Sequence, residues 1–490
     1  MKKLNIVYIL ADDLGYGDLK CYNNSSKIPT SNIDQIAKEG MRFTDAHSPS
    51  SVCTPSRYGI LTGRYCWRTR LKKGVFQGYN LPLIKISRLT LAGLLKKVGY
   101  DTACIGKWHL GLKYKAKPKY NFDFTNPPGF DKEFEEKIDF SQPVEGGPTD
   151  LGFDRFFGTA ACSTCNAPYG FIKNKEFIKI PSFYHNNPVY TSRPGLMVPG
   201  WEHKKADTTF CKQAVKYIKE RQNKTRPFFL YLATSAPHEP CTEDVVPEFA
   251  RGKSEAGPRG DLVWLVDWIV GEIVKTLKNT GQYDNTMFVI TSDNGALPGD
   301  RILGEDGKDH YFTYGHKSCG NWRGYKAHIW EGGHREPFII RFPGIVKPNS
   351  VSNALVGLHD FYATCAELFN FELTNDIAED SFSFLYVLTG KKPQQPVRNH
   401  IVHHSQKGVF SIRKGEWKLI LETLGSGGWP PPKGEGPKPG SPGQLYNIKR
   451  DPYEKNNLFN KYPNIVKELT QFLEKLKERG ESTPLRGNNN

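Results

Sequence analysis

The hydrophobic pattern of the chain alternates between short apolar runs and amphipathic segments. Continuous apolar runs, which suit strands buried on both faces of a sheet, occur at 4–10, 100–105, 226–233, 287–290 and 338–342. Segments with an apolar face at helical spacing lie between them, at 28–40, 89–98, 205–221 and 261–277. Buried strands alternating with helices predict one large α/β domain.

The pattern changes near residue 396. Short segments at 399–404, 408–412 and 416–421 suggest an antiparallel sheet, and a final helix at 464–479 is expected to pack on it. We therefore predict a domain over 1–395 and a smaller subdomain over 396–490. Within the first, residues 111–205 have weak periodicity and are predicted to be a functional insertion. A Pro/Gly-rich loop at 424–440 is either a flexible linker or a lip over a site.

Composition narrows the class of protein. The chain has 490 residues, of which 38% are hydrophobic, and a formal net charge of +16. No segment approaches the roughly 20 apolar residues of a membrane span. The positive charge favours anionic partners. Zinc-finger spacing, an RNA-binding aromatic signature and long Lys/Arg blocks are missing from the sequence, so we do not expect nucleic acid as a partner.

Polar side chains follow four of the predicted strands at their carboxyl ends, where open α/β sheets hold their ligands. They are Asp12 and Asp13, Lys107 and His109, His238, and Asp293 and Asn294. Adjacent carboxylates repel and need a cation or a shared proton, and carboxylate with amide oxygens suits Ca²⁺. In an extended chain Lys107 and His109 would face one side as an anion site with a proton carrier. The alternatives are solvated Asp or Asx turns and ordinary loop residues.

A possible nucleophile begins the segment Cys53-Thr54-Pro55-Ser56-Arg57. Proline is tolerated in a first helical turn, and Gly63 is a plausible helix end, so Cys53 is expected at a helix N-terminus. Backbone N–H groups favour an anion there, and Arg57 can face the same way one turn later. The pattern indicates an oxyanion site, with a buried Cys beside a surface Arg as the alternative.

One pair of the ten cysteines has the CxxC spacing, Cys162 and Cys165. A redox or zinc role would need a second pair nearby, and the sequence shows none. Structural thiols or a local disulfide are therefore favoured over a metal site.

Several motifs resemble those of the type I sulfatases. They are D-D-x-G-x-G from Asp12, C-T-P-S-R from Cys53, G-K-W-H-L-G from Gly106, S-D-N-G from Ser292, and R-G-x-K…W-E-G-G-x-R-x-P from Arg323. The resemblance runs in order from residue 5 to about 343 and recurs near 444–458. It implies an alkaline-phosphatase-like fold, with a large mixed sheet flanked by helices and a C-terminal α+β subdomain with a short antiparallel sheet.

The resemblance also implies a function and its residues. A maturation enzyme would convert Cys53 to formylglycine, whose hydrate is the nucleophile. Asp12, Asp13, residue 53, Asp293 and Asn294 would surround one Ca²⁺, with Asp293 placed to assist deprotonation of the attacking hydroxyl. Arg57, Lys107, His109 and Lys326 would hold the sulfate oxygens and the diol. His238 with Lys326 would protonate the leaving alcohol, and His109 would take the second hydroxyl proton. Lys317 is the near alternative to Lys326.

The form that these motifs take in this chain is most similar to that in carbohydrate sulfatases. We expect a sulfated saccharide substrate, of galactose or N-acetylgalactosamine type, from glycosaminoglycan or algal polysaccharide. A phosphonate monoester or phosphodiester hydrolase of the same superfamily is one alternative, and a non-catalytic sulfated-polysaccharide-binding protein is another. Met1-Lys2-Lys3 runs directly into the first strand without a signal peptide. Because sulfatases are commonly exported, we expect a periplasmic or secreted protein whose signal has been removed, rather than a cytoplasmic one.

Overall fold

The computed structural model describes residues 4–120, 124, 127–129, 131–186, 193–303, 309–391, 396–421, 425–431 and 442–484. The predicted Pro/Gly loop at 424–440 lies mostly outside these ranges, as do parts of the predicted insertion at 111–205. No helix in the described ranges is both long and apolar enough to cross a bilayer.

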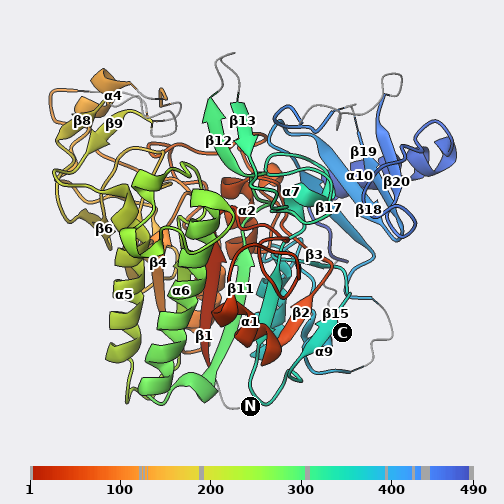
Figure 1. Cartoon of the computed structure of the whole chain (residues 1–490), viewed down its shortest axis with the longest axis horizontal. Helices are drawn as coiled ribbons and strands as arrows, with labels where there is room; N and C mark the ends of the chain where they lie inside the picture. Colours follow the sequence, from red (N-terminus) through yellow and green to blue (C-terminus); the bar gives the residue numbers. More distant parts are fainter. Residues whose placement is uncertain are drawn as a thin grey trace.

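A ten-stranded mixed sheet forms the centre of the larger domain, in the order β15-β2-β14-β11-β1-β10-β4-β5-β6-β7 (Figure 1). Its strands are β1 (Asn5–Ala11), β2 (Met41–Phe43), β4 (Asp101–Lys107), β5 (Arg155–Thr159), β6 (Ile172–Lys173), β7 (Glu176–Phe177), β10 (Phe228–Ala233), β11 (Thr286–Ser292), β14 (Phe338–Arg341) and β15 (Ser350–Ser352). Strands β11, β1, β10, β4 and β5 run parallel, while β14 is antiparallel to β11. The five predicted strands of this sheet are confirmed.

Helices cover both faces of the sheet. On one face lie α1 (Ser31–Lys38), α5 (Ala206–Glu220) and α6 (Gly257–Asn279), and on the other lie α2 (Cys53–Thr62), α3 (Leu91–Lys97) and α8 (Asp360–Leu368). Alternation along β1 explains the two layers. Val7 and Ile9 pack with the first group, whereas Ile6, Tyr8 and Leu10 pack with the second. A strand buried on both faces reads as a continuous apolar run, which is why the sequence indicated it.

The C-terminal sheet is antiparallel, in the order β17 (His400–His404), β18 (Phe410–Lys414), β19 (Trp417–Ile420) and β20 (Gln444–Asn447). Helix α10 (Pro463–Arg479) packs Leu469, Leu473 and Leu476 against Val402, Ile412 and Leu419 of this sheet. The three predicted strands and the final helix are confirmed. The fourth strand, β20, was not predicted, although its residues had been noted as a motif.

Shorter elements complete the described chain. They are β3 (Ala46–His47) paired with β16 (Val356–Gly357), β8 (Phe183–His185) with β9 (Gly195–Met197), β12 (Asp300–Leu303) with β13 (Asp309–Phe312), and helices α4 (Lys132–Glu136), α7 (Glu331–His334) and α9 (Leu385–Leu388). The 3₁₀ turns are Cys66–Arg68, Pro148–Asp150, His203–Lys205, Glu243–Val245, Glu248–Ala250 and Tyr283–Asn285. Strand β5 lies inside the predicted insertion yet pairs with β4, so the insertion is partly sheet.

Candidate active site

Four oxygen-bearing side chains meet where β1 and β11 end, as the sequence predicted. Asp12 and Asp13 follow β1, and Asp293 and Asn294 follow β11; all four are fully buried. The Asp13 backbone N–H donates to Asp293 Oδ1 at 3.2 Å, and Asn294 Nδ2 donates to Asp13 Oδ1 at 2.7 Å. Because β1 and β11 are parallel neighbours, their carboxyl ends bring these residues together.

Each of the three carboxylates faces a cationic side chain. Lys107 Nζ lies 2.5 Å from Asp12 Oδ2, and Lys326 Nζ lies 2.6 Å from Asp13 Oδ2. The third pair joins Arg57 Nε to Asp293 Oδ2 at 2.8 Å. Burial alone would raise the pKa of Asp12, but the positive charges, chiefly that of Lys107, hold it well below its usual range. We name these residues, together with Cys53, His238 and Asn294, the strand-end cluster.

Two buried oxygens of this cluster fit a metal ion. Within the described ranges, Asp12 Oδ1 and Asn294 Oδ1 have no hydrogen-bond partner. Buried acceptors of this kind are costly unless something coordinates them. Burial and the charge of Asp12 also raise the pKa of Asp293 to about 7, which a cation nearby would counteract. Carboxylate and amide oxygens are the ligands that Ca²⁺ prefers, so the donor set suits this ion.

Cys53 occupies the first position of α2, as predicted. The helix ends at Gly63, which has a φ of +64°. The Cys53 sulfur lies within 4.8 Å of ligand atoms of Asp12, Asp13 and His238. Arg57 Nη1 donates to the Lys107 carbonyl at 3.0 Å, while its Nη2 has no hydrogen-bond partner among the described residues. This Nη2 lies 3.5 Å from Asp12 Oδ1, so an anion beside residue 53 would share the guanidinium with that carboxylate.

The backbone conformation at His109 differs from the extended one that the sequence predicted. The chain does not stay extended, because His109 has a φ of +60° just after β4 ends at Lys107. Its Nε2 lies 2.7 Å from the Phe76 carbonyl, so Nε2 carries the proton that it donates. Its Nδ1 has no partner in the described part of the chain. Burial, with the Lys107 charge, keeps the pKa of His109 well below its usual range, so the ring is a neutral proton acceptor.

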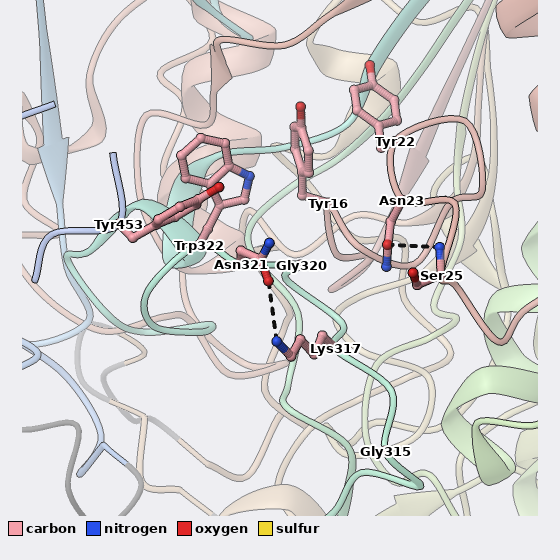
Figure 2. A pocket seen from close by; sticks show the side chains of 10 residues that line it. All are labelled: Tyr16, Tyr22, Asn23, Ser25, Gly315, Lys317, Gly320, Asn321, Trp322 and Tyr453. Atoms are coloured by element: carbon pink, nitrogen blue, oxygen red, sulfur yellow. Dashed lines mark hydrogen bonds between the residues drawn. The ribbon is translucent and has the colours of Figure 1, made fainter. Parts of the chain in front are cut away.

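The two lysine candidates occupy very different environments. Lys317 is exposed, and its Nζ donates to Asn321 Oδ1 at 3.3 Å. It lines a surface pocket with Tyr16 and Trp322 (Figure 2). Lys326 is buried and reaches Asp13. The Lys326 backbone N–H donates to the Ala296 carbonyl at 2.9 Å, which ties this loop to the end of β11. The structure therefore favours Lys326 as the lysine of the site.

His238 lies between the strand-end cluster and two thiols of the insertion. Its Nε2 is 3.8 Å from Asp13 Oδ2, and its Nδ1 donates to the Glu239 carbonyl at 2.7 Å. Cys162 Sγ lies 3.4 Å from Nδ1, and Cys165 Sγ lies 3.9 Å from it. All cysteines in the described ranges are unpaired, so the local disulfide considered from sequence is not formed. Sequence reasoning noted the CxxC pair but missed its contact with His238.

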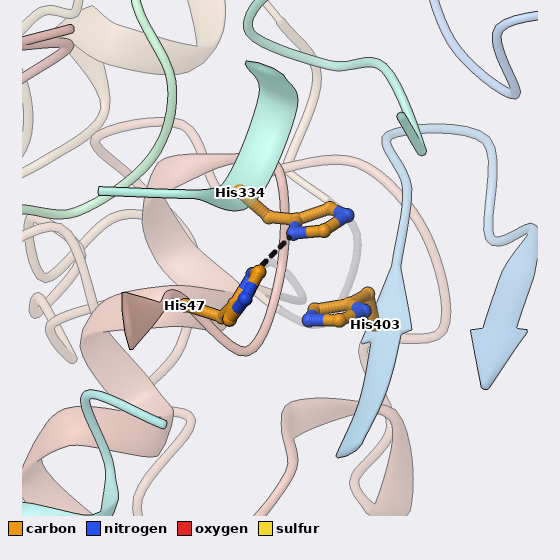
Figure 3. Close-up of side chains that lie close together, drawn as sticks. All are labelled: His47, His334 and His403. Atoms are coloured by element: carbon orange, nitrogen blue, oxygen red, sulfur yellow. Dashed lines mark hydrogen bonds between the residues drawn. The ribbon is translucent and has the colours of Figure 1, made fainter. Parts of the chain in front are cut away.

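A second buried polar group, the histidine cluster, was not predicted. His47 of β3, His334 of α7 and His403 of β17 converge between the larger domain and the C-terminal sheet (Figure 3). His47 Nδ1 lies 3.0 Å from His334 Nδ1, and the rings of His334 and His403 stack with centroids 3.6 Å apart. The Lys418 ammonium is 3.1 Å from His334 Nε2, where its charge opposes a bound cation. We interpret this cluster as part of the polar core.

Comparison with known proteins identifies the family. The sulfatase family model matches residues 4–371. The chain is 36% identical to the N-acetylgalactosamine-6-O-sulfatase of Bacteroides thetaiotaomicron, over 98% of this chain and 94% of the relative. Human arylsulfatase A is 31% identical, over 96% and 86% respectively. A solved Bacteroides thetaiotaomicron structure, described with the metabolism of multiple glycosaminoglycans, aligns with a TM-score of 0.81 and 30% identity, over 98% and 100%.

The family model covers the strand-end cluster, and the matches to individual relatives and to the solved structure span 96–98% of the chain. The predicted fold class, a large mixed sheet flanked by helices with a smaller antiparallel sheet, is confirmed and is the alkaline-phosphatase-like fold of this family. The chain is a sulfuric ester hydrolase that belongs to the sulfatase family.

Proposed function

We propose that this sulfatase removes a 6-O-sulfate from N-acetylgalactosamine, or from the closely related galactose, in a sulfated glycan. The observation that carries the activity is the strand-end cluster, in which three carboxylates each pair with a cation and ligand atoms of Asp12, Asp13 and His238 lie within 4.8 Å of the residue 53 sulfur. The sugar and the position of the sulfate rest on similarity to the Bacteroides thetaiotaomicron enzyme along nearly its whole length. The net charge of +16 suits an anionic polymer as substrate.

Two groups supplied after translation complete the proposed site. Calcium, held by Asp12, Asp13, Asp293, Asn294 and residue 53, would contribute positive charge beside the sulfate ester. Formylglycine made from Cys53 by a maturation enzyme would provide a nucleophilic hydroxyl group that is restored after each turnover. The unpartnered oxygens of Asp12 and Asn294 support the calcium assignment.

The remaining residues of the site bind the ester and position protons. Arg57, Lys107 and Lys326 would hold the sulfate oxygens and offset their charge as the bond to the leaving oxygen breaks. Arg57 Nη2, which has no hydrogen-bond partner in the described ranges and lies 3.5 Å from Asp12 Oδ1, is the group that would donate to the sulfate. Fixed donors in a water-excluding site act without reorganising, so their contribution to catalysis is large.

Two histidines are suited to opposite proton transfers. His238 turns Nε2 toward Asp13 and is assigned to protonate the leaving alcohol, with Lys326 beside it. His109 is neutral and has an unpartnered Nδ1, so it is assigned to accept the proton of the second hydroxyl. Asp293, whose Oδ2 lies 2.8 Å from Arg57 Nε beside residue 53, is assigned to assist deprotonation of the attacking hydroxyl.

The test is the release of free sulfate, measured by ion chromatography, from oligosaccharides sulfated at defined positions. The protein would first be shown by peptide mass analysis to carry formylglycine at residue 53. We expect release from 6-sulfated N-acetylgalactosamine and little from the 4-sulfated isomer. The Cys53→Ala variant should fall to background, because it has no nucleophile.

Two other outcomes would favour the alternative functions. Faster turnover of phosphodiesters than of any sulfate ester would favour the phosphodiester hydrolase alternative. Saccharide binding that survives Cys53→Ala, with no sulfate release from the mature wild type, would favour a binding protein.

A further inference from the structure

Cys162, Cys165 and His238 form a group with metal-ligating chemistry that the sulfatase reaction does not use. Their ligand atoms, two sulfurs and a ring nitrogen, lie within 4.8 Å of one another. The three residues are buried, with 0%, 3% and 7% of their surface exposed respectively. A thiol–thiol–imidazole set differs from the strand-end oxygens, because it suits soft or borderline cations rather than calcium.

The spacing of the ligand atoms matches the geometry of zinc. With Zn–S near 2.3 Å and Zn–N near 2.0 Å, tetrahedral angles place sulfur and nitrogen about 3.5 Å apart. The two S···Nδ1 separations here are 3.4 Å and 3.9 Å. Two hydrogen bonds connect the loops that carry these ligands. Ser163 Oγ donates to Ser235 Oγ at 2.7 Å, and Thr164 Oγ1 donates to the Glu239 carbonyl at 2.8 Å. These bonds hold the CxxC loop against the loop of His238.

His238 offers a different nitrogen to each neighbouring group. Nε2 faces Asp13 of the strand-end cluster, at 3.8 Å from its Oδ2, while Nδ1 faces the thiols. The Glu239 carbonyl oxygen lies 2.7 Å from Nδ1, so a metal at the thiols would displace the Nδ1 proton and require the imidazole to turn away from this carbonyl. An imidazole that binds a metal through Nδ1 carries its one proton on Nε2 and is a far weaker acid than the imidazolium, so proton transfer to the leaving alcohol would slow.

We propose that Cys162, Cys165 and His238 form a binding site for a thiophilic divalent cation, with Zn²⁺ as its probe, and that filling this site inhibits the enzyme. The inhibition rests on the function proposed above, but metal binding does not. Cys165 and His238 each keep a small exposed fraction, so the group is not fully sealed from solvent.

The first experiment is a cobalt titration of the formylglycine-bearing wild type, with saturating calcium and a non-thiol reductant. Cobalt bound to thiolates gives a sulfur-to-metal charge-transfer band in the near ultraviolet, and we expect this band with one cobalt per chain. Cobalt at the calcium site gives no such band, because residue 53 is no longer a thiol in the mature protein. Zinc should then bleach the band by displacement. A wild type without the band would overturn the proposal.

The second experiment compares zinc inhibition across variants, each measured relative to its own activity. In the Cys162→Ser/Cys165→Ser double variant, half-inhibition should need at least about 10- to 100-fold more zinc, because loss of a supporting residue alone costs that much affinity. Cys241→Ser is the matched control, since Cys241 is also buried but lies against the Pro237 carbonyl outside the group. It should keep the wild-type response.

The outcomes distinguish failure of the metal-site proposal from failure of the function proposed above. Equal zinc inhibition in the double variant and the wild type would place the inhibitory ion elsewhere and overturn the proposal. If no sulfate ester is hydrolysed, the cobalt band still decides whether the metal site exists. If the double variant does not fold, the wild-type band and its loss on adding zinc remain decisive.

Discussion

The strand-end cluster and the histidine cluster are equally shielded from water but differ in ionisation. Asp12 and Lys107 in the first, and His47, His334 and His403 in the second, are all fully buried. In the strand-end cluster each carboxylate lies against a cation, and the pKa of Asp12 stays well below its usual range. In the histidine cluster burial lowers the pKa of all three rings, so they are neutral.

The difference shows that counter-charge can keep a buried group ionised, as Lys107 does for Asp12, although for Asp293 burial and the Asp12 charge outweigh Arg57. Desolvation disfavours the charged form in both places. Near the histidines, Lys418 is paired with Glu331 at 3.0 Å and with Glu454 at 2.9 Å, so those carboxylates are already occupied. His47 Nε2 also lies 2.8 Å from Asp45 Oδ1, but that carboxylate is itself paired with Arg335 and Arg413. The other contacts of the imidazoles are with each other and with Ser411.

The same contrast separates a reactive site from a packed one. The strand-end cluster retains unpartnered ligand atoms at Asp12 and Asn294, within the described ranges, and these suit incoming ions. The histidine cluster also has one such atom, His403 Nε2, but its rings stack, the Lys418 ammonium lies 3.1 Å from His334 Nε2, and the cluster joins β3, α7 and β17. Changes to the first should therefore alter catalysis, and changes to the second should alter stability.

The largest expected effect is the loss of Lys326. Lys326→Met removes a buried cation that would hold the sulfate, so kcat/KM for sulfate release should fall by about 10²- to 10³-fold. Lys317→Met is the matched control, because Lys317 is exposed and bonded to Asn321, and it should leave kcat/KM nearly unchanged. A larger loss at Lys317 than at Lys326 would reverse the assignment of the sulfate lysine.

The next effect concerns calcium and is read from thermal melting rather than activity. Calcium at 100 times its Kd should stabilise the protein by about 2.7 kcal/mol, because only the folded state gathers the strand-end ligands. Asp13→Asn should lose most of this calcium-dependent rise in Tm. His403→Gln should keep it, since His403 lies outside the strand-end cluster. A calcium response that is unchanged in Asp13→Asn would contradict the proposed ligand set.

The strand-end cluster could be predicted from sequence because its signals are local. Each functional pair, such as Asp12 with Asp13 or Asp293 with Asn294, directly follows a buried strand, and parallel strands align their carboxyl ends. The main strands and helices could be predicted for the same reason, since apolar runs and helical periodicity report burial directly.

Contacts that depend on the path of the chain between elements could not be predicted. His47 and His334 are 287 positions apart, and no local pattern connects them. Cys162 reaches His238 only through the route of an irregular loop in the insertion. The turn that reorients His109 follows Gly106, which has a φ of +112°, but glycine in sequence does not specify its own conformation. Strand β5 is a short segment in a region of weak periodicity.

The smallest expected effect is a pH dependence of folding stability that arises from the histidine cluster. The three clustered histidines have folded pKa values below the unfolded value of about 6.5. As pH falls below 6.5 the unfolded chain binds protons that the folded chain excludes, so stability present at neutral pH is lost on acidification. Each ring kept neutral should cost up to about 1.4 kcal/mol of unfolding free energy per pH unit.

His403→Gln isolates one ring of this set. The variant should be less stable than the wild type near neutral pH, because it loses the stacking on His334. Its deficit in unfolding free energy should shrink between about pH 6.5 and 5.5, since glutamine takes up no proton on unfolding. His310→Gln, at an exposed position, should show no such change. A deficit for His403→Gln that stays constant with pH would mean that His403 binds protons as readily in the folded chain as in the unfolded one, so burial would not be lowering its pKa.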